Sequence, residues 1–339
     1  MLAKCRTLAL AALSAVAYCQ WALGQAAPAT ILDIELANFV VYFSDVTDYS
    51  RLATDPNRTT VTQPRNFSRG IGIADIVSVN GRPAKGVMTE QRTQFNLRVI
   101  PTPGQAIADV EDRNIRSERY YEILKPDGTP IGSLLAVGNG GGTPPPGAPL
   151  VSSQANLVIV GGTGAFLGAR GQETGPDNAG LPAPRPASVT EDPANRRVHG
   201  GGRRHFLLHV IPLLRPEVVI TASGPAVTHA SNFSLVTAAN PARSGEILAL
   251  FATGLGPTLP GVDPGKPFPA SPLARVNSPV EVTVNGAPAE VLDAVGFPGA
   301  VDGYQVNFRV PSGMTPGQAR LQVSAAWIAG PEVTIPVQQ

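Results

Sequence analysis

Residues 156–172 read NLVIVGGTGAFLGARGQ, an apolar run that enters a glycine cluster and leaves it through a second apolar run. Dinucleotide-binding domains also carry glycines after a strand, in the pattern G-x-G-x-x-G followed by a helix. Here Leu167 stands at the third glycine position, and the residues from Gly175 onward are too rich in Gly and Pro for a helix. The stretch therefore predicts two β-strands joined by a glycine turn, and no nucleotide site.

On both sides of this stretch, apolar residues recur with period two and the runs end in turn residues, which is typical of β-strands. Besides 156–160 and 166–173, the expected strands are 31–43, 71–79, 84–99, 119–124, 131–137 and 204–211. Asn80-Gly81 favours a type I′ hairpin, because both residues tolerate positive φ. These eight strands, with no amphipathic helix between them, predict an all-β domain at 30–215.

From residue 216 the expected strands become shorter and more closely spaced. They are 218–222, 246–252, 280–284, 289–295, 304–310, 319–325 and 333–337, with a tight hairpin at Asn285-Gly286. This spacing favours an Ig-like β-sandwich as a second domain at 216–339. Two insertions rich in Gly and Pro, 138–147 and 175–202, are expected to be mobile loops.

The N-terminal segment has the plan of a secretory signal peptide. Lys4 and Arg6 precede an apolar run at 8–16, and small residues follow at 22, 24 and 26. The apolar run is shorter than the roughly 20 residues that a membrane span needs. We therefore expect a signal peptide at 1–24 and a secreted protein, extracellular, on the cell surface or in the periplasm, with no membrane span after cleavage.

The charge balance bears on the class of partner. The chain has 26 Lys and Arg against 25 Asp and Glu, and loss of residues 1–24 removes two basic residues and both cysteines, Cys5 and Cys19. Nucleic-acid binding needs a basic excess that this nearly neutral chain lacks. We expect no nucleic-acid partner, and a fold stabilised by apolar cores without disulfides.

Four segments resemble, in the same order, segments of dirigent proteins, which are relatives of the allene oxide cyclase barrel. Residues 156–172 are similar to the family signature VVGGTG-x-F-x-x-ARG. The other three are VYFSD at 41–45, GRPAKG at 81–86 and GTPIGSLLAVG at 128–138. The resemblance implies an eight-stranded antiparallel barrel around an apolar lumen, and a homotrimer.

The same resemblance gives candidate site residues. Dirigent proteins hold a reactive substrate in the lumen, where two acids assist proton transfer and tyrosines and an arginine place the substrate. Asp45 matches the first acid, whereas Gly140 stands at the second acid and Ala155 at the arginine. Met88 and Glu90 stand where the family has tyrosines, and Glu90 is the candidate second carboxylate. The candidate catalytic residues are thus Asp45 and Glu90, and the candidate ligand-binding residues are Tyr42, Met88 and Arg170.

The second domain carries a resemblance of its own. Residues 235–257 and 303–317 are similar to the C-terminal module of secreted acidobacterial proteins, a β-sandwich related to IPT/TIG domains, and the match covers 226–337. That module has no catalytic residues. The resemblance implies a display, spacer or attachment role.

Three histidines near the end of the first domain raise the question of a metal. His205 and His209 share a face of the expected strand but lie about 13 Å apart, so they cannot bind one ion. The chain contains no H-E-x-x-H, G-x-S-x-G or Walker pattern. We expect no metal site and no cofactor.

Because the resemblance to dirigent proteins lacks most of the family's proton-handling residues, the leading expectation is a secreted, non-catalytic binding protein. Its barrel lumen would hold a small apolar ligand or its barrel surface would bind a cell-surface polymer, with the sandwich as spacer. One alternative is a dirigent-like or cyclase/isomerase activity that uses Asp45, with Glu90 as its partner. Another is cell-surface adhesion or assembly.

Overall fold

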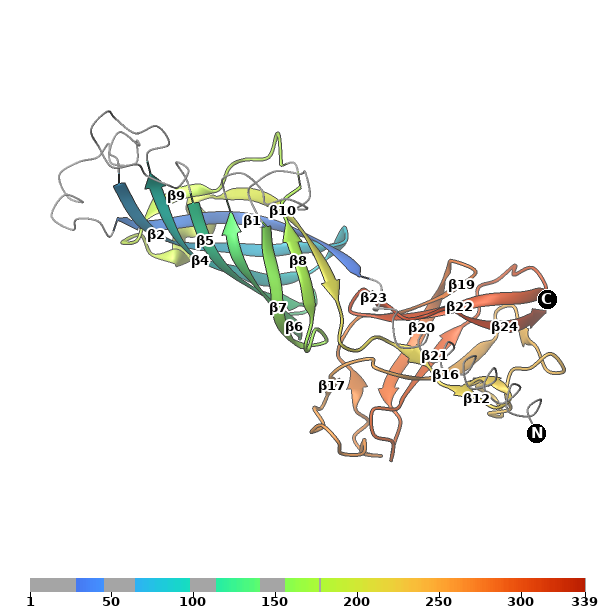
Figure 1. Cartoon of the computed structure of the whole chain (residues 1–339). Coiled ribbons are helices and arrows are strands. Elements are labelled where there is room, and N and C mark those ends of the chain that lie inside the picture. Colours follow the sequence, from blue (N-terminus) through green and yellow to red (C-terminus); the bar gives the residue numbers. More distant parts are fainter. Residues whose placement is uncertain (1–28, 46–64, 98–113, 141–155, 177, 339) are drawn as a thin grey trace, which may run out of the picture.

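The computed structural model describes residues 29–45, 65–97, 114–140, 156–176 and 178–338. Residues 1–24, the expected signal peptide, and most of the 138–147 insertion lie outside these ranges. Figure 1 shows a barrel joined to a second, curled sheet. Among the described residues, no helix is long and apolar enough to cross a membrane.

Eight antiparallel strands close into the barrel. They are β1 (Thr30–Asp45), β2 (Arg65–Val79), β4 (Lys85–Leu97), β5 (Asn114–Leu124), β6 (Pro130–Gly140), β7 (Asn156–Gly164), β8 (Arg170–Thr174) and β10 (Gly202–Ile211). Neighbours along the chain pair with each other, β8 pairs with β10, and β10 pairs with β1. Pairing of β1 with β2 closes the ring. The all-β barrel predicted from the sequence is therefore confirmed.

Local chemistry explains the turns at one end of the barrel. Asn80 and Gly81 both have positive φ, 52° and 72°, as a type I′ hairpin requires, and the two-residue strand β3 (Arg82–Pro83) follows. Gly164 has a φ of 61°, and a Cβ there would lie 2.5 Å from the carbonyl oxygen of Ile131. The glycine turn at 165–168 thus separates β7 from β8, which begins at Arg170 and not at Phe166 as the sequence predicted.

The insertion 175–202 is not the mobile loop that its Gly and Pro content predicted. Its described part, which we call the strap (residues 178–200), contains β9 (Arg185–Ser188), η2 (Pro193–Asn195) and α2 (Arg196–His199). Strand β9 pairs in parallel with β1. Asp75 of β2 accepts hydrogen bonds from Arg196 and Arg197 of the strap, at 2.8 Å for Arg197. The Gly and Pro content of the segment could not predict this order, because the contacts that hold the segment come from β1 and β2.

The second sheet contains twelve strands, six of them five residues or longer. The longer strands are β16 (Ile247–Thr253), β19 (Val280–Val284), β20 (Ala287–Gly296), β21 (Tyr304–Arg309), β22 (Gly317–Ala325) and β24 (Val333–Gln338). The short ones are β11 (Glu217–Val218), β14 (Val227–His229), β15 (Ala242–Arg243), β17 (Thr258–Leu259), β18 (Arg275–Val276) and β23 (Ile328–Ala329). The expected strand 218–222 is split between β11 and a separate small pair, β12 (Ile220–Thr221) with β13 (Gly224–Pro225). The Ig-like assignment stays a prediction.

The hairpin between β22 and β23 packs against the end of the barrel (Figure 1). Ala326 and Ile328 are almost completely buried and belong to the apolar core of the barrel, and Trp327 packs against that core. Arg82 beside the β2–β4 turn forms an ion pair with Glu281 of β19. Asn277 donates a hydrogen bond to the carbonyl oxygen of Pro130, at the β5–β6 turn. One end of the barrel is therefore covered by the second sheet.

Candidate functional site

The side chains of β5 alternate between the inside and the outside of the barrel. Ser117, Arg119, Tyr121 and Ile123 are buried, whereas their neighbours 116, 118, 120 and 122 are exposed. Three inward positions on this strand, Ser117, Arg119 and Tyr121, therefore carry polar or charged groups at a depth where a barrel usually places apolar side chains. An arginine inside a barrel needs partners, because burying an unpaired charge is very costly.

Arg119 finds its partners on two other strands. Its Nε and Nη2 donate to Oε1 of Glu90 on β4 at 3.2 and 3.1 Å, and its Nη1 donates to Oε1 of Glu173 on β8. Ser117 donates to the same Glu90 oxygen at 2.8 Å, and the Tyr121 hydroxyl donates to Oε2 of Glu173 at 2.8 Å. We call Glu90, Ser117, Arg119, Tyr121 and Glu173 the interior cluster.

The two carboxyls of the interior cluster differ in their electrostatics. Burial by itself raises the pKa of Glu90, but the charges of Arg119 and Arg92 outweigh it and hold that pKa below its ordinary value. Burial dominates for Glu173, whose pKa is raised above its ordinary value despite the hydrogen bonds from Arg119 and Tyr121. The cluster thus pairs a carboxylate that stays ionised with a carboxyl group that retains its proton to higher pH.

One atom of the interior cluster is unsatisfied. Oε2 of Glu90 is buried and accepts no hydrogen bond from any described residue. Gly70 and Gly72 face the same part of the interior, and a Cβ on either would lie 3.0 Å from a side-chain atom of Arg92 or Glu90, respectively. The two large charged side chains therefore fit inside the barrel because these two positions are glycine.

Apolar side chains fill the barrel between the interior cluster and the second sheet. Among those with less than 2% exposure are Leu32, Ile34, Leu36, Met88, Ile123, Leu134, Leu157, Ile159, Phe166 and Leu208. They form one cluster that ends at Ala326 and Ile328 of the hairpin. This half of the interior is therefore a packed core.

The residues predicted as site residues do not gather in one place. Glu90 belongs to the interior cluster, and Met88 lies two residues away in the apolar core. Tyr42 is buried outside that core, and burial, together with the charge of Glu191 in the strap, raises its pKa above the ordinary value. Arg170 is exposed and donates to the carbonyl oxygens of Val160 and Ala169, at 2.6 and 3.0 Å. Asp45 ends β1, and its side chain lies outside the described residues.

Arg119, Tyr121 and Glu173 were not among the site residues predicted from the sequence. The sequence could have indicated the residues on β5. Alternate residues of a strand share one face, so Tyr121, Arg119 and Ser117 lie on the same face as the apolar Ile123. Glu173 was assigned to a strand but not to a site. Its inward direction follows only from the pairing of β8 with β7 and β10, which the sequence does not show.

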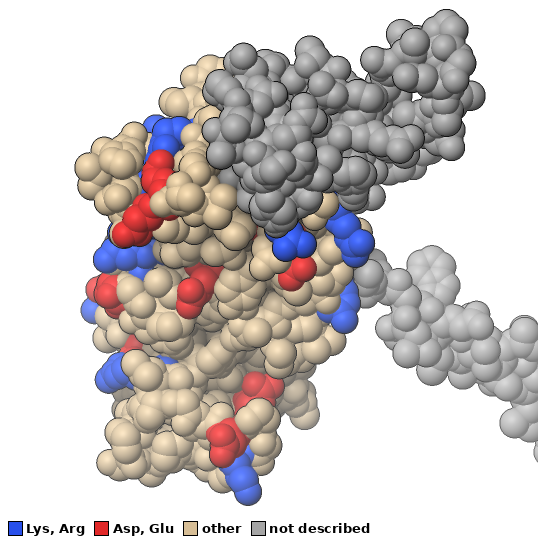
Figure 2. Space-filling view, turned by 90° about the vertical axis from the view of Figure 1, so that its left-hand side faces the viewer, with Lys and Arg blue, Asp and Glu red and all other residues tan. Residues whose placement is uncertain are grey.

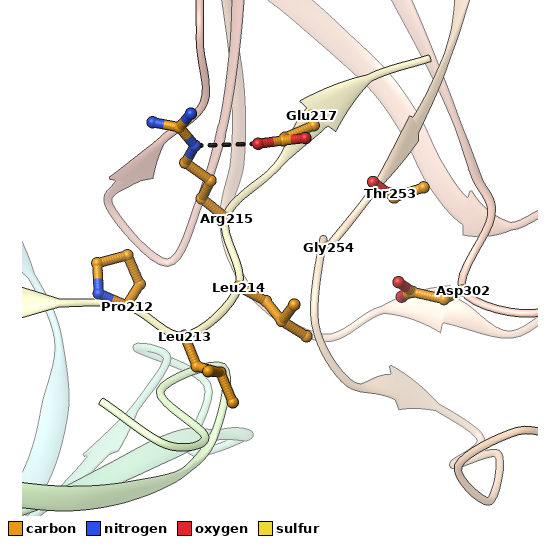
Figure 3. Close-up of a pocket in the computed structure, with 8 residues that line it drawn as sticks. All are labelled: Pro212, Leu213, Leu214, Arg215, Glu217, Thr253, Gly254 and Asp302. Atoms are coloured by element: carbon orange, nitrogen blue, oxygen red, sulfur yellow. Dashed lines mark hydrogen bonds and ion pairs between the residues drawn. The ribbon is translucent and has the colours of Figure 1, made fainter. Parts of the chain in front are cut away.

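A groove of about 280 Å³ lies where β10 leads into the second sheet (Figure 3). It holds an arginine and two acids, but Arg215 already pairs with Glu217 at 3.1 Å. Leu213 lies against Gly168 of the glycine turn. Its arginine and one of its two acids thus satisfy each other, which makes the interior cluster the stronger candidate site.

The histidines of β10 lie four residues apart on one strand, and His205 contacts an acid of β1. His205 lies 2.9 Å from Asp33 of β1 through Nδ1, and β10 is a continuous strand, as predicted. In the described ranges, no group of three or more His, Cys, Asp or Glu side chains could hold a metal ion.

In comparisons with known proteins, no protein-family model and no curated protein matches the chain.

Proposed function

We propose that this chain is an exported binding protein that holds a small molecule in the barrel, at the interior cluster, without transforming it. The observation that carries the proposal is the buried Oε2 of Glu90, which has no hydrogen-bond donor. Leaving such a group unsatisfied costs about 1–3 kcal/mol, and more when it is charged. A ligand that donates a hydrogen bond to this oxygen removes that cost.

The surroundings of Glu90 define the rest of the ligand. Phe39 lies beside Glu90, next to Gly72, and Phe206 stacks on Arg119, so aromatic faces border the charged atoms. We infer a mainly apolar molecule with a hydroxyl or amide donor. This changes the expectation of a purely apolar ligand, because the described interior is charged at this level.

The family resemblances support the remaining parts of the proposal. The dirigent-like segments fit a barrel that binds a small molecule, and the IPT/TIG-like segments fit an Ig-like sandwich that attaches the barrel to a surface. Export rests on the signal-peptide pattern at 1–24. A homotrimer is part of the proposal by the same resemblance, and light scattering of the purified protein tests it.

Native mass spectrometry of protein purified from its own host tests the binding. The wild-type protein is expected to carry an added mass that is released on unfolding. Glu90→Gln should carry much less of it, because the charge that accepts the donor is gone. Glu122→Gln, an exposed position on β5, is the matched control and should match the wild type. Wild-type protein without added mass, or equal occupancy in Glu90→Gln, contradicts the proposal.

A second candidate function is a proton-transfer reaction of the isomerase or cyclase type. The observation that favours it is the opposite displacement of the Glu90 and Glu173 pKa values, since one site then offers a base and an acid. The ligand found by mass spectrometry should then take up deuterium from D2O in the presence of protein. Glu173→Gln should abolish uptake but still bind. Binding without uptake leaves only the first candidate.

A further inference from the structure

The outer face of the barrel carries a groove that shares one lining residue, Ser117, with the interior cluster. It has a volume of about 390 Å³ and crosses β2, β4, β5 and β6. We call it the outer groove and define it by its outward residues, Arg69, Ile71, Gln91, Thr93, Arg116, Glu118 and Val137. Gly70, Arg92 and Ser117, which lie between these residues along the strands, complete the lining.

Strand register arranges these residues in two rows. Thr93 pairs with Arg69 on one side and with Arg116 on the other, which makes the first row. Gln91 pairs with Ile71 and with Glu118, which in turn pairs with Val137, and these make the second row. Four adjacent strands span roughly 14 Å across the sheet. The outer groove is thus long enough for a chain-like ligand that lies across the strands.

The two arginines of the first row are available to a ligand. Arg69 and Arg116 are exposed, and neither has a hydrogen bond or ion pair with a described residue. A guanidinium binds carboxylate and sulfate groups through paired donors. Thr93 stands between the two arginines, and Gln91 lies in the next row, so both can hydrogen-bond hydroxyl groups. Ile71 and Val137 supply apolar contact at the two ends of the second row.

From this arrangement we infer that the outer groove binds an acidic saccharide chain, one that bears carboxylate or sulfate groups. Arginines bind the acidic groups, Thr93 and Gln91 bind hydroxyls, and the apolar residues contact the ring faces. Single-stranded nucleic acid fits less well, because it binds to aromatic platforms and the described lining has none. Figure 2 also shows basic and acidic side chains interspersed on this end of the molecule.

Binding to immobilised polygalacturonate and to heparin tests the inference. The wild-type protein should bind at least one of them at low salt and release it as salt rises, because exposed charges are screened. Arg69→Gln with Arg116→Gln should weaken binding about tenfold, since exposed charge pairs each contribute modestly. Glu118→Gln should strengthen binding, because it removes a like charge from the groove.

Matched controls separate the groove from general charge. Lys85→Gln with Lys266→Gln changes the net charge by the same amount at exposed positions outside the groove and should bind like the wild type. Circular dichroism of the arginine variant confirms that the fold is intact. The inference is overturned if neither polymer binds, if the lysine variant loses as much affinity as the arginine variant, or if single-stranded DNA binds more tightly than either polymer.

Discussion

The guanidinium carbon of Arg119 lies 4.3 Å from the centre of the Phe206 ring, deep inside the barrel. The ring covers one face of the guanidinium, and the two glutamates take up the donors at its edge. Arg119 is thus the residue on which the charge balance of the interior depends.

Replacing Arg119 by Met is expected to lower the free energy of unfolding by about 3–5 kcal/mol, because two acids then remain buried without their cation. Urea unfolding followed by circular dichroism measures the change. Adding Glu90→Gln and Glu173→Gln to the same protein should recover much of the loss, because no buried charge then lacks a partner. A triple variant as unstable as Arg119→Met alone would show that shape, and not charge, sets the effect.

The two glutamates should give opposite pH dependences. The pKa of Glu173 is raised in the folded protein, so its contribution to stability is present below about pH 4.5 and is lost as pH rises through the folded pKa. The pKa of Glu90 is lowered, so its contribution is present above about pH 4.5 and is lost as pH falls. Urea midpoints measured between pH 3 and 8 test both. In Glu173→Gln the loss of stability with rising pH should disappear, and in Glu90→Gln the loss of stability with falling pH should disappear.

The strap should detach from the barrel in acid. Burial raises the pKa of Asp75, but hydrogen bonds from Arg197 and Asn38 and the charge of Arg196 outweigh it and bring the pKa to about 2. Because the unfolded value is 3.8, the carboxylate stabilises the fold by about 2 kcal/mol above pH 4, and this is lost between pH 4 and 2.

Hydrogen exchange of the strap measures this attachment. Asp75→Asn should raise exchange at neutral pH to the level that the wild type reaches in acid. Asp263→Asn, which replaces an exposed acid in the second part of the chain, is the control and should leave the strap protected. Equal protection in Asp75→Asn and wild type would mean that β9 alone holds the strap.

The β22–β23 hairpin is expected to stabilise the barrel. Ile328→Ala removes a buried side chain from the barrel core and should cost about 2–5 kcal/mol. Without residues 1–24 the chain has one tryptophan, Trp327, so its emission reports on this junction. Ile328→Ala should shift that emission to the red and lower the urea midpoint. Leu292→Ala, at a partly exposed position of β20, should do neither.

Strand positions could be predicted from the sequence because they depend on local alternation and on turn residues. Residues 280–284 match β19, and Asn285-Gly286 has the positive φ values of the expected hairpin. The hairpin at Ala326-Trp327 was not predicted. Both residues have positive φ, 50° and 64°, which Ala and Trp rarely adopt, and packing against the barrel accompanies this conformation.

The candidate site could be predicted only in part. Glu90 was found through the resemblance. Its pairing with Arg119 depends on the register of β4 with β5. Glu173, the other partner of Arg119, lies 54 residues after it in the sequence. The strap shows the same limit, because the hydrogen bonds to Asp75 cross more than 120 residues. Long-range contacts of charged groups leave no periodic trace in a sequence.

The interior cluster also decides how β5 is aligned. The outward face of this strand contains Arg116, Glu118 and Tyr120, and the inward face contains Ser117, Arg119 and Tyr121, so the two faces are chemically alike. A slip by one residue would exchange these side chains and would turn Ile123 outward and Glu122 inward. It would also move the guanidinium away from Glu90 and Glu173 and leave both acids unpaired. Buried ion pairs add little net stability in a protein interior. Here their consequence is that they fix the register of β5 in the barrel.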